Sequence, residues 1–287
     1  MGCTQSQQVA YHGLDDDQEA TLVVVERAIN SLSIIGSCSI IACWIAFQPL
    51  RKFAFKLVLF LSISDVVGGI AGLISPGKDA CGACLFQAYL YSIFGLSSVL
   101  WTACIGHCLN RAICYQDVEA HRYEFRYHLF AWGVPIALAI LPQFFNAYGN
   151  ENGQCWILPE HAPLRFLQFY IPLWGVLAWN ASLYRGLIAS LKAVLRTPAD
   201  SLQQRTDMKI FWRLGLYPVI LVVCWFFASV NRLQQSLYPG HPLFILFLLH
   251  RLLAGSQGLL NCFVYGLNPA VRSALSNAFC GREAGKE

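Results

Sequence analysis

The sequence predicts an all-α membrane protein, a bundle of seven transmembrane helices with its N-terminus outside and its C-terminus inside the cell. Composition is the first reason: 56% of the 287 residues are hydrophobic and only 13% are charged, whereas a soluble domain carries about a quarter charged residues. The second reason is that seven apolar stretches approach the roughly 20 residues that a helix needs to cross a bilayer. The third is the uneven distribution of Lys and Arg among the connecting segments.

The first three stretches give the clearest helices. Residues 28–47 contain no charged residue, residues 57–75 contain only Asp65, and residues 84–109 contain no Asp, Glu, Lys or Arg and a single histidine, His107. Each stretch is apolar enough and long enough to span a membrane. We therefore expect the first three helices over residues 22–47, 55–75 and 84–112.

The last four stretches are more heavily interrupted. Pro135 and Pro142 lie in the short fourth stretch and Pro218 lies in the sixth, but prolines are tolerated in membrane helices because neighbouring helices can satisfy the freed carbonyls. The seventh stretch contains His250 and Arg251. The predicted helices cover residues 129–147, 166–192, 209–231 and 243–267, with an extracellular segment at 1–21 and a cytoplasmic tail, including a short amphipathic helix, at 268–287.

Orientation follows from the basic residues. With the N-terminus outside, fifteen of the twenty Lys and Arg residues fall on the cytoplasmic side and four on the outer side, as the positive-inside rule requires. This assignment needs an odd number of helices. Residues 1–6, MGCTQS, match an N-myristoylation pattern that needs a cytosolic N-terminus, so the charge distribution argues against modification of Gly2.

Asp65 is the first candidate functional residue, because an ionisable group inside a membrane is costly and needs a partner. Asn30 on the first helix and Asn261 on the seventh are candidate partners for its carboxylate. The cluster that they form would be either a functional switch or a purely structural knot of hydrogen bonds.

A second group of candidates would line a cavity in the outer half of the bundle. Arg251 either extends to the outer surface or faces a central cavity, where it could pair with an anionic group of a ligand. We favour the cavity, because a lipid-facing arginine has many less costly replacements. Aromatic residues in membrane helices more often serve packing or the interface, so the other members are separate hypotheses: Gln87, Tyr91, Trp101, Gln168, Trp174, Asn231 and His250.

His107 and Arg111 end the third helix on its inner side. They are four residues apart and therefore share a helix face. A polar patch there could hold the inner ends of the helices together and open on activation, although an ordinary basic boundary explains the residues equally well. The basic segment 185–213 can likewise serve orientation alone, or meet anionic lipid or an acidic partner.

Three cysteines could meet an oxidising compartment together: Cys81, Cys84 and Cys155. A disulfide from Cys155 would hold the second outer loop over the mouth of the bundle, with Cys84 and Cys81 as competing partners. The Cys81–Cys84 spacing also fits redox or zinc chemistry, but a single CxxC is a weak signal. We find no catalytic constellation, and we expect no enzyme activity, cofactor or metal site.

Several segments carry a family resemblance: LVLFLSISD ending at Asp65, Cys84 together with Cys155-Trp156, VLWTACIGHCLNRAICY in the third helix, WGVP from Trp132, and SQGLLNCFVYGLNPAVR over residues 256–272. Together they resemble G-protein-coupled receptors over about residues 22–282. The closest similarity is to the cyclic-AMP-receptor-like group of the slime-mould type, which borders the secretin and adhesion receptors.

This resemblance implies a receptor that transduces an extracellular signal to a heterotrimeric G protein, a disulfide between Cys84 and Cys155, and a polar core at Asp65. The chain departs from rhodopsin-like receptors in the motif that ends the third helix, where Arg111 follows an asparagine instead of an acidic residue. A shared fold does not identify the ligand. The expected partners are therefore a G protein, an extracellular ligand of open identity and membrane lipid, with no nucleic acid, in a multi-pass protein of the plasma membrane.

Two other classes of membrane protein remain as alternatives. A seven-helix transporter or channel would show repeated halves or a path of facing ionisable groups, and the sequence has neither. An accessory protein with a receptor fold but no transducer is the other alternative, and only an assay of G-protein activation separates it from a receptor.

Overall fold

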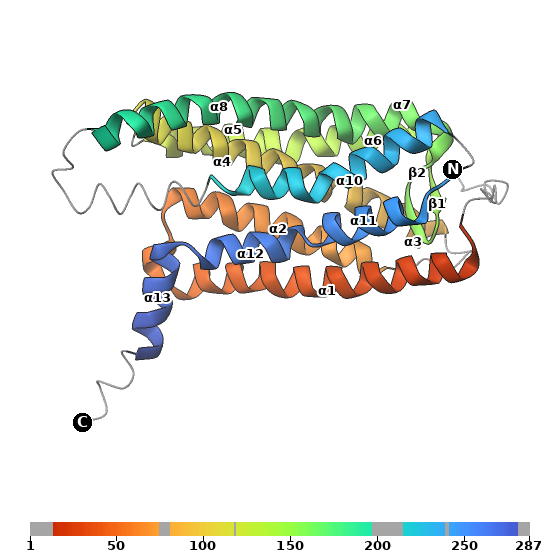
Figure 1. The fold of residues 1–287 in the computed structure, drawn as a ribbon, viewed down its shortest axis with the longest axis horizontal. Helices are drawn as coiled ribbons and strands as arrows, with labels where there is room; N and C mark the ends of the chain where they lie inside the picture. The colour runs from red at the N-terminus through yellow and green to blue at the C-terminus, as the bar shows by residue number, and fades with distance from the viewer. Residues whose placement is uncertain (1–13, 75–80, 118, 197–214, 239–240, 281–287) are drawn as a thin grey trace.

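The computed structural model describes residues 14–74, 81–117, 119–196, 215–238 and 241–280. The Gly2 motif and most of the basic segment 185–213 lie outside these ranges, and so does the predicted start of the sixth helix at residue 209. Within the described residues, long helices run side by side along one axis, with a β-hairpin at one end and a helix turned aside at the other (Figure 1). We call these the hairpin end and the tail end.

Seven helical rods form the bundle of the described chain. Three of them, the third to the fifth, pass through a π-helical turn, a rare feature that is frequent at functional sites. The rods are α1 (Asp16–Ala46), α2 (Phe53–Leu73), α3 (Cys81–Leu90) joined to α4 (Leu96–Cys114), α5 (Glu124–His128) joined to α6 (Val134–Phe144), α7 (Ala162–Arg165) joined to α8 (Ile171–Arg196), α10 (Tyr217–Leu237), and α11 (Phe244–Gly255) followed by α12 (Gln257–Gly266). α13 (Pro269–Cys280) is the helix turned aside at the tail end.

The surface of this bundle is apolar and its interior is partly polar. Val24, Ile35 and Phe263 are each more than 60% exposed, whereas Asn30 and Asp65 are buried. In the part of the chain that the structure describes, five continuous helical segments are long and apolar enough to cross a membrane, and the bent pair α11–α12 makes a sixth. The chain is a multi-pass membrane protein, since only lipid makes exposed apolar side chains and paired interior polar groups favourable together.

Several helices begin or end at places that the sequence analysis did not predict, and the physical reason is clear for two of them. α1 begins at Asp16 and not at residue 22, because the Asp15 carboxylate caps it by accepting from the Gln18 amide at 2.7 Å. α10 continues six residues beyond the predicted end at 231, to Leu237, because polar side chains such as Arg232 find partners at the hairpin end. Apolarity alone could not mark these ends.

The seventh rod is bent by 42° between α11 and α12. The break lies at the Gly255-Ser256 pair, a sequence that commonly kinks a helix, and the Ser256 hydroxyl donates to the carbonyl of Leu253 at 2.7 Å. A single unbroken helix over residues 243–267 was expected. The bend instead divides this rod into a segment at the hairpin end and one at the tail end.

A β-hairpin that the sequence analysis did not foresee closes the hairpin end. β1 (Tyr148–Glu151) pairs antiparallel with β2 (Gln154–Ile157) through a two-residue turn. Asn152 and Gly153 form that turn with φ values of 52° and 78°, and this left-handed pair gives the twist that two-residue hairpins need. The Cys84–Cys155 disulfide ties β2 to α3.

α12 packs closely against α1 because Gly258 has no side chain. A Cβ at this position would lie 2.3 Å from Ser37 Oγ and 2.9 Å from the backbone oxygen of Ser33. Membrane helices use small residues at such contacts, because lipid supplies no hydrophobic drive for helix association.

Gly258→Ala should therefore lower the free energy of unfolding by about 1–3 kcal/mol, the usual cost of overpacking a close contact. Gly266→Ala is the matched control, since a Cβ there meets no atom within 4 Å; it should be neutral or stabilising by up to about 1 kcal/mol. Thermal unfolding of the purified variants in detergent measures both, and equal effects would contradict the close contact.

Candidate functional site

A cavity of about 120 Å³ runs through the hairpin-end half of the bundle towards its middle. Glu26 and Arg251 line its hairpin end, and Asp65 lines its deep end. A cavity of this size has room for several waters. It brings two clusters of polar side chains, one near the hairpin and one in the bundle core, into the same space.

The first cluster joins α1, the third rod and α11. Arg251 forms an ion pair with Glu26, and the Tyr91 hydroxyl donates to the second oxygen of that carboxylate at 2.5 Å. Arg251 also donates to the backbone oxygen of Asn152 at 2.8 Å, at the hairpin turn. Because Glu26 and Arg251 are both nearly inaccessible to solvent, neither charge could remain there without the other.

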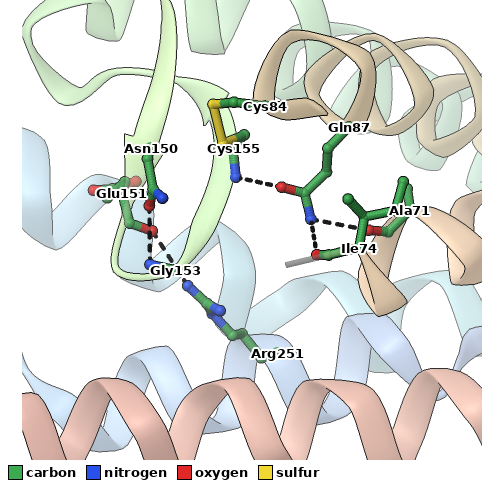
Figure 2. Close-up of a disulfide and its surroundings, with 9 residues drawn as sticks. All are labelled: Ala71, Ile74, Cys84, Gln87, Asn150, Glu151, Gly153, Cys155 and Arg251. Carbon is green, nitrogen blue, oxygen red and sulfur yellow. Dashed lines mark hydrogen bonds between the residues drawn. A yellow bond between two sulfur atoms is a disulfide. The ribbon is translucent and has the colours of Figure 1, made fainter. Parts of the chain in front are cut away.

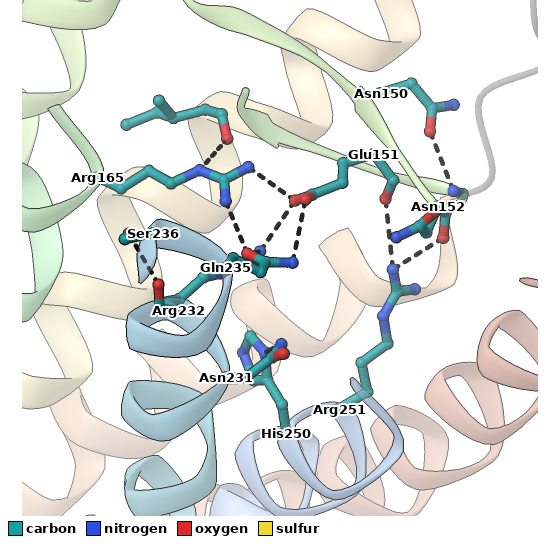
Figure 3. A network of polar contacts seen from close by, with 12 residues as sticks. Asn150, Glu151, Asn152, Arg165, Asn231, Arg232, Gln235, Ser236, His250 and Arg251 are labelled. Atoms are coloured by element: carbon teal, nitrogen blue, oxygen red, sulfur yellow. Dashed lines mark hydrogen bonds and ion pairs between the residues drawn. The ribbon is translucent and has the colours of Figure 1, made fainter. Parts of the chain in front are cut away.

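Glu151 connects the hairpin to two further arginines (Figure 3). Its Oε2 atom accepts from Arg165 Nη2 at 2.7 Å and from Arg232 Nη1 at 2.9 Å. Burial disfavours the charged form of Glu151, but the guanidiniums of Arg232 and Arg165 outweigh this cost and hold the pKa of the carboxyl below its usual value. The hairpin is therefore fixed over the cavity by charge as well as by its disulfide.

Gln87 completes the attachment of the hairpin (Figure 2). Its side-chain amide donates to the backbone oxygens of Ala71 and Ile74, each at 2.9 Å, and its Oε1 accepts from the Cys155 amide at 2.8 Å. Gln87 was expected to line the cavity. It instead joins the end of α2 to β2, beside the disulfide.

The second cluster surrounds Asp65 at the deep end of the cavity. Its Oδ2 accepts from the Asn261 amide at 2.7 Å, and its Oδ1 accepts from the Ser98 hydroxyl at 2.6 Å and more weakly from Gln257 at 3.3 Å. Gln257 also donates to Ser98 at 2.5 Å. These bonds join α2, α4 and α12 at one carboxylate.

Asn30, the other partner expected for Asp65, does not reach the carboxylate. Its amide donates to the Glu26 carbonyl one helical turn earlier, at 2.8 Å, although its side chain lines the same cavity. Asn30 thus lies between the two clusters.

The tail end of the third rod carries a separate cluster. Arg111 forms an ion pair with Asp117 at 2.7 Å, and its guanidinium lies 4.7 Å from the Tyr115 ring centre. Arg122 pairs with the same carboxylate. The adjacent Arg111 guanidinium is the main reason that the pKa of Asp117 is lowered.

His107, one turn earlier on the same helix, contacts the Tyr127 hydroxyl on α5 at 2.7 Å. Arg111 and His107 therefore both contact the part of the chain that follows α4, up to the start of the fourth rod.

The remaining predicted cavity residues lie apart from the cavity. Trp101 is fully buried, with its ring stacked 5.0 Å from that of Phe60. Trp174 is 48% exposed on the outside of the bundle. Gln168 is buried, and the Asn231 side-chain amide Nδ2 donates to His250 Nδ1 at 3.2 Å. Of the expected set, the cavity is lined by Tyr91, His250 and Arg251.

Sequence analysis did not single out four residues that carry the charge of this site. Glu26 lies two residues before the uncharged stretch 28–47, within the predicted first helix but outside the stretch that was searched for intramembrane charges. Arg165 and Arg232 were counted as outer loop charges. Glu151 had one available signal, the Asn-Gly turn that follows it and predicts a hairpin.

Comparison with known proteins gives a consistent result. The family model described as slime mold cyclic AMP receptor matches residues 14–279. G-protein coupled receptor 1 of Arabidopsis thaliana is 31% identical over 272 residues, which is 92% of this chain and 83% of that protein. Cyclic AMP receptor-like protein A of Dictyostelium discoideum is 29% identical over 239 residues, 83% of this chain and 62% of that protein.

A solved structure, that of squid rhodopsin, has the same fold. It superposes with a TM-score of 0.74, covering 97% of this chain and 89% of the rhodopsin chain, at 17% sequence identity. At this identity the similarity establishes the seven-helix fold alone.

The Glu26–Arg251 pair provides a test of the site's architecture. Glu26→Gln should lower the free energy of unfolding by about 3–5 kcal/mol, because a buried guanidinium would lose its counter-charge. The double variant Glu26→Gln with Arg251→Gln should lose less than the sum of the single changes.

Glu19→Gln is the control for this pair on the same helix, since its carboxylate makes no ion pair within the described residues. It should change stability by no more than about 0.5 kcal/mol. Denaturant unfolding of the wild type, the two single variants, the double variant and Glu19→Gln measures these values, and additive losses in the double variant would show that the pair is not coupled.

Proposed function

The chain belongs to the slime mold cyclic AMP receptor family of G-protein-coupled receptors, and we propose that it carries a signal from a ligand at the hairpin end to a heterotrimeric G protein at the tail end. It is a signalling receptor and not an enzyme. Family membership favours this function over the transporter or channel that the sequence left as an alternative.

The single observation that carries the proposal is the continuous cavity between the two polar clusters. It begins at Arg251 below the hairpin and ends at Asp65. A ligand that changes the contacts at the first cluster can therefore alter the hydrogen bonds at the second. Such a ligand would favour one of two bundle arrangements by the difference in its affinity for them.

The hairpin end faces the outside in this proposal. The disulfide between Cys84 and Cys155 lies there, and disulfides persist in oxidising environments such as the cell exterior. The tail end then carries most of the basic residues, as the positive-inside rule requires. The plasma membrane is the compartment that fits both features.

Arg111 and its neighbours form the proposed G-protein-facing surface. In the structure Asp117 holds the Arg111 guanidinium between the tail end of α4 and the segment leading to α5. Release of Arg111 from that carboxylate would present a cation to a partner. Arg111 and the Asp65 cluster lie on or against the same helix, α4, which supports a connection between them.

Cyclic AMP is the first ligand to test, because several relatives bear its name. The chain spans 62% of the length of cyclic AMP receptor-like protein A and 53% of cyclic AMP receptor 4, both from Dictyostelium discoideum. The Arabidopsis thaliana relative, of which the chain spans 83%, is named only as a G-protein coupled receptor.

Nucleotide exchange on a heterotrimeric G protein, measured in membranes with and without a ligand panel, tests the proposal. We expect Asp65→Asn and Arg111→Ala to change exchange by about tenfold at equal surface expression, a typical size for coupling between two sites. Arg27→Ala, which removes an exposed arginine at the hairpin end of α1, is the control and should leave exchange unchanged.

Exchange that is identical in all four proteins would contradict the assigned roles of Asp65 and Arg111. No exchange under any condition would favour an accessory protein with a receptor fold, and solute flux into vesicles would favour the transporter.

A further inference from the structure

Among the described residues, the polar cluster beneath the hairpin contains more cations than anions. Three guanidiniums, those of Arg165, Arg232 and Arg251, meet two carboxylates, those of Glu26 and Glu151. All three arginines are at most 4% exposed. His250, bonded to Asn231, adds a titratable group next to the cluster. A buried cluster with one unmatched positive charge is a favourable place for another anion.

The Glu151 carboxylate binds two of these guanidiniums through only one of its two oxygens. Arg165 and Arg232 both donate to its Oε2 atom, while its Oε1 atom accepts, within the described residues, only from Gln235 Nε2, at 3.3 Å. The Trp156 ring lies against both guanidiniums, with its centre 5.8 Å from one and 5.6 Å from the other. We call this arrangement of Arg165, Arg232 and Trp156 the arginine cradle.

The residue that occupies the cradle comes from a hairpin and not from a helix of the bundle. Glu151 ends β1, directly before the Asn152-Gly153 turn (Figure 3). A side chain on such a connection can withdraw with a local movement, whereas the arginines are held on α7 and α10. The cradle can thus exchange its occupant while the bundle stays in place.

The cavity gives a second molecule access to the same cations. Arg232 and Arg251 both line it, and Arg251 Nε, although buried, has no hydrogen-bond partner among the described residues. A buried N–H donor without an acceptor is costly, so an oxygen at this end of the cavity would be bound favourably. Arg232 thus belongs both to the cradle and to the cavity wall, and a molecule in the cavity can reach the cradle through it.

We propose that the arginine cradle is an oxyanion-binding site, that Glu151 is its internal occupant, and that the receptor's ligand carries a phosphate or carboxylate group that takes the place of Glu151. This inference rests on the proposed function in treating the cavity as the ligand site. A phosphate or carboxylate matches a guanidinium through paired N–H···O bonds. At present both arginines donate to the single Oε2 atom of Glu151, whereas the three oxygens of a phosphate group would accept from more of their N–H donors.

The test uses the full-length chain in phosphatidylcholine nanodiscs and inorganic phosphate as the probe. Glu151→Gln should lower the melting temperature by on the order of 5–10 °C, because two buried guanidiniums lose their carboxylate. Sodium phosphate should then raise it by about 3–5 °C at ten times its dissociation constant, relative to sodium chloride at equal ionic strength. A sodium acetate series shows whether the site distinguishes phosphate from carboxylate.

Two controls separate the cradle from general salt effects. Glu160→Gln makes the same chemical change at an exposed position near the hairpin, and neither it nor the wild type should respond to phosphate beyond chloride. Adding Arg232→Gln to Glu151→Gln should abolish the response. An equal phosphate response in Glu160→Gln, or none in Glu151→Gln, would overturn the proposal.

Glu151→Asp keeps the inference testable if the glutamine variant does not fold. It retains the charge but shortens the side chain by one methylene, so it should fold and show a smaller stabilisation by phosphate. No phosphate effect in a folded Glu151→Asp protein would also overturn the proposal. Because these measurements contain no G protein, their failure is distinguishable from a failure of coupling.

Discussion

A charge inside this bundle has to be neutralised by another part of the chain, because the surrounding lipid cannot solvate it. The Glu26–Arg251 ion pair shows the consequence most directly. Its members are 225 residues apart in sequence and belong to α1 and α11. Once the pair forms, the first and last rods of the bundle are held together, and the cavity acquires a polar wall that water or a ligand can use.

The same constraint explains why the hairpin matters to the bundle. Arg165 and Arg232 lie on different rods and would repel each other without Glu151 between them. Removing one partner from such a buried group leaves a charge uncompensated, a larger loss than the net stability of the pair itself. The hairpin is thus part of the electrostatic core of the receptor, even though it lies at the end of the fold.

Sequence patterns predicted the features that depend on composition. They were less successful with features that depend on whether a side chain points towards lipid or towards the interior of the bundle. The seven-helix fold followed from apolar stretches of membrane length. The cavity residues did not, because lipid and the bundle interior are both apolar and the periodicity of Trp101 or Trp174 cannot distinguish them. The π-helical turn Tyr91–Gly95 adds a residue to the third rod and rotates every side chain after it relative to those before it. Gln87 and Trp101, on either side of that turn, were assigned to one cavity and lie outside it.

The bend in the seventh rod lies between the two polar clusters. α11 carries Arg251, which contacts Glu26 and the hairpin, and α12 carries Gln257 and Asn261, which contact Asp65. The Gly255-Ser256 step lies between them and is already bent by 42°. Because α12 is packed tightly on α1 at Gly258, a force on Arg251 is more easily absorbed by changing this bend than by sliding α12. A change in the bend would move Gln257, the first residue after it, relative to Ser98 and Asp65. In the proposed receptor mechanism, a signal from the hairpin would therefore reach the core of the bundle along the seventh rod, through the bend at Gly255-Ser256.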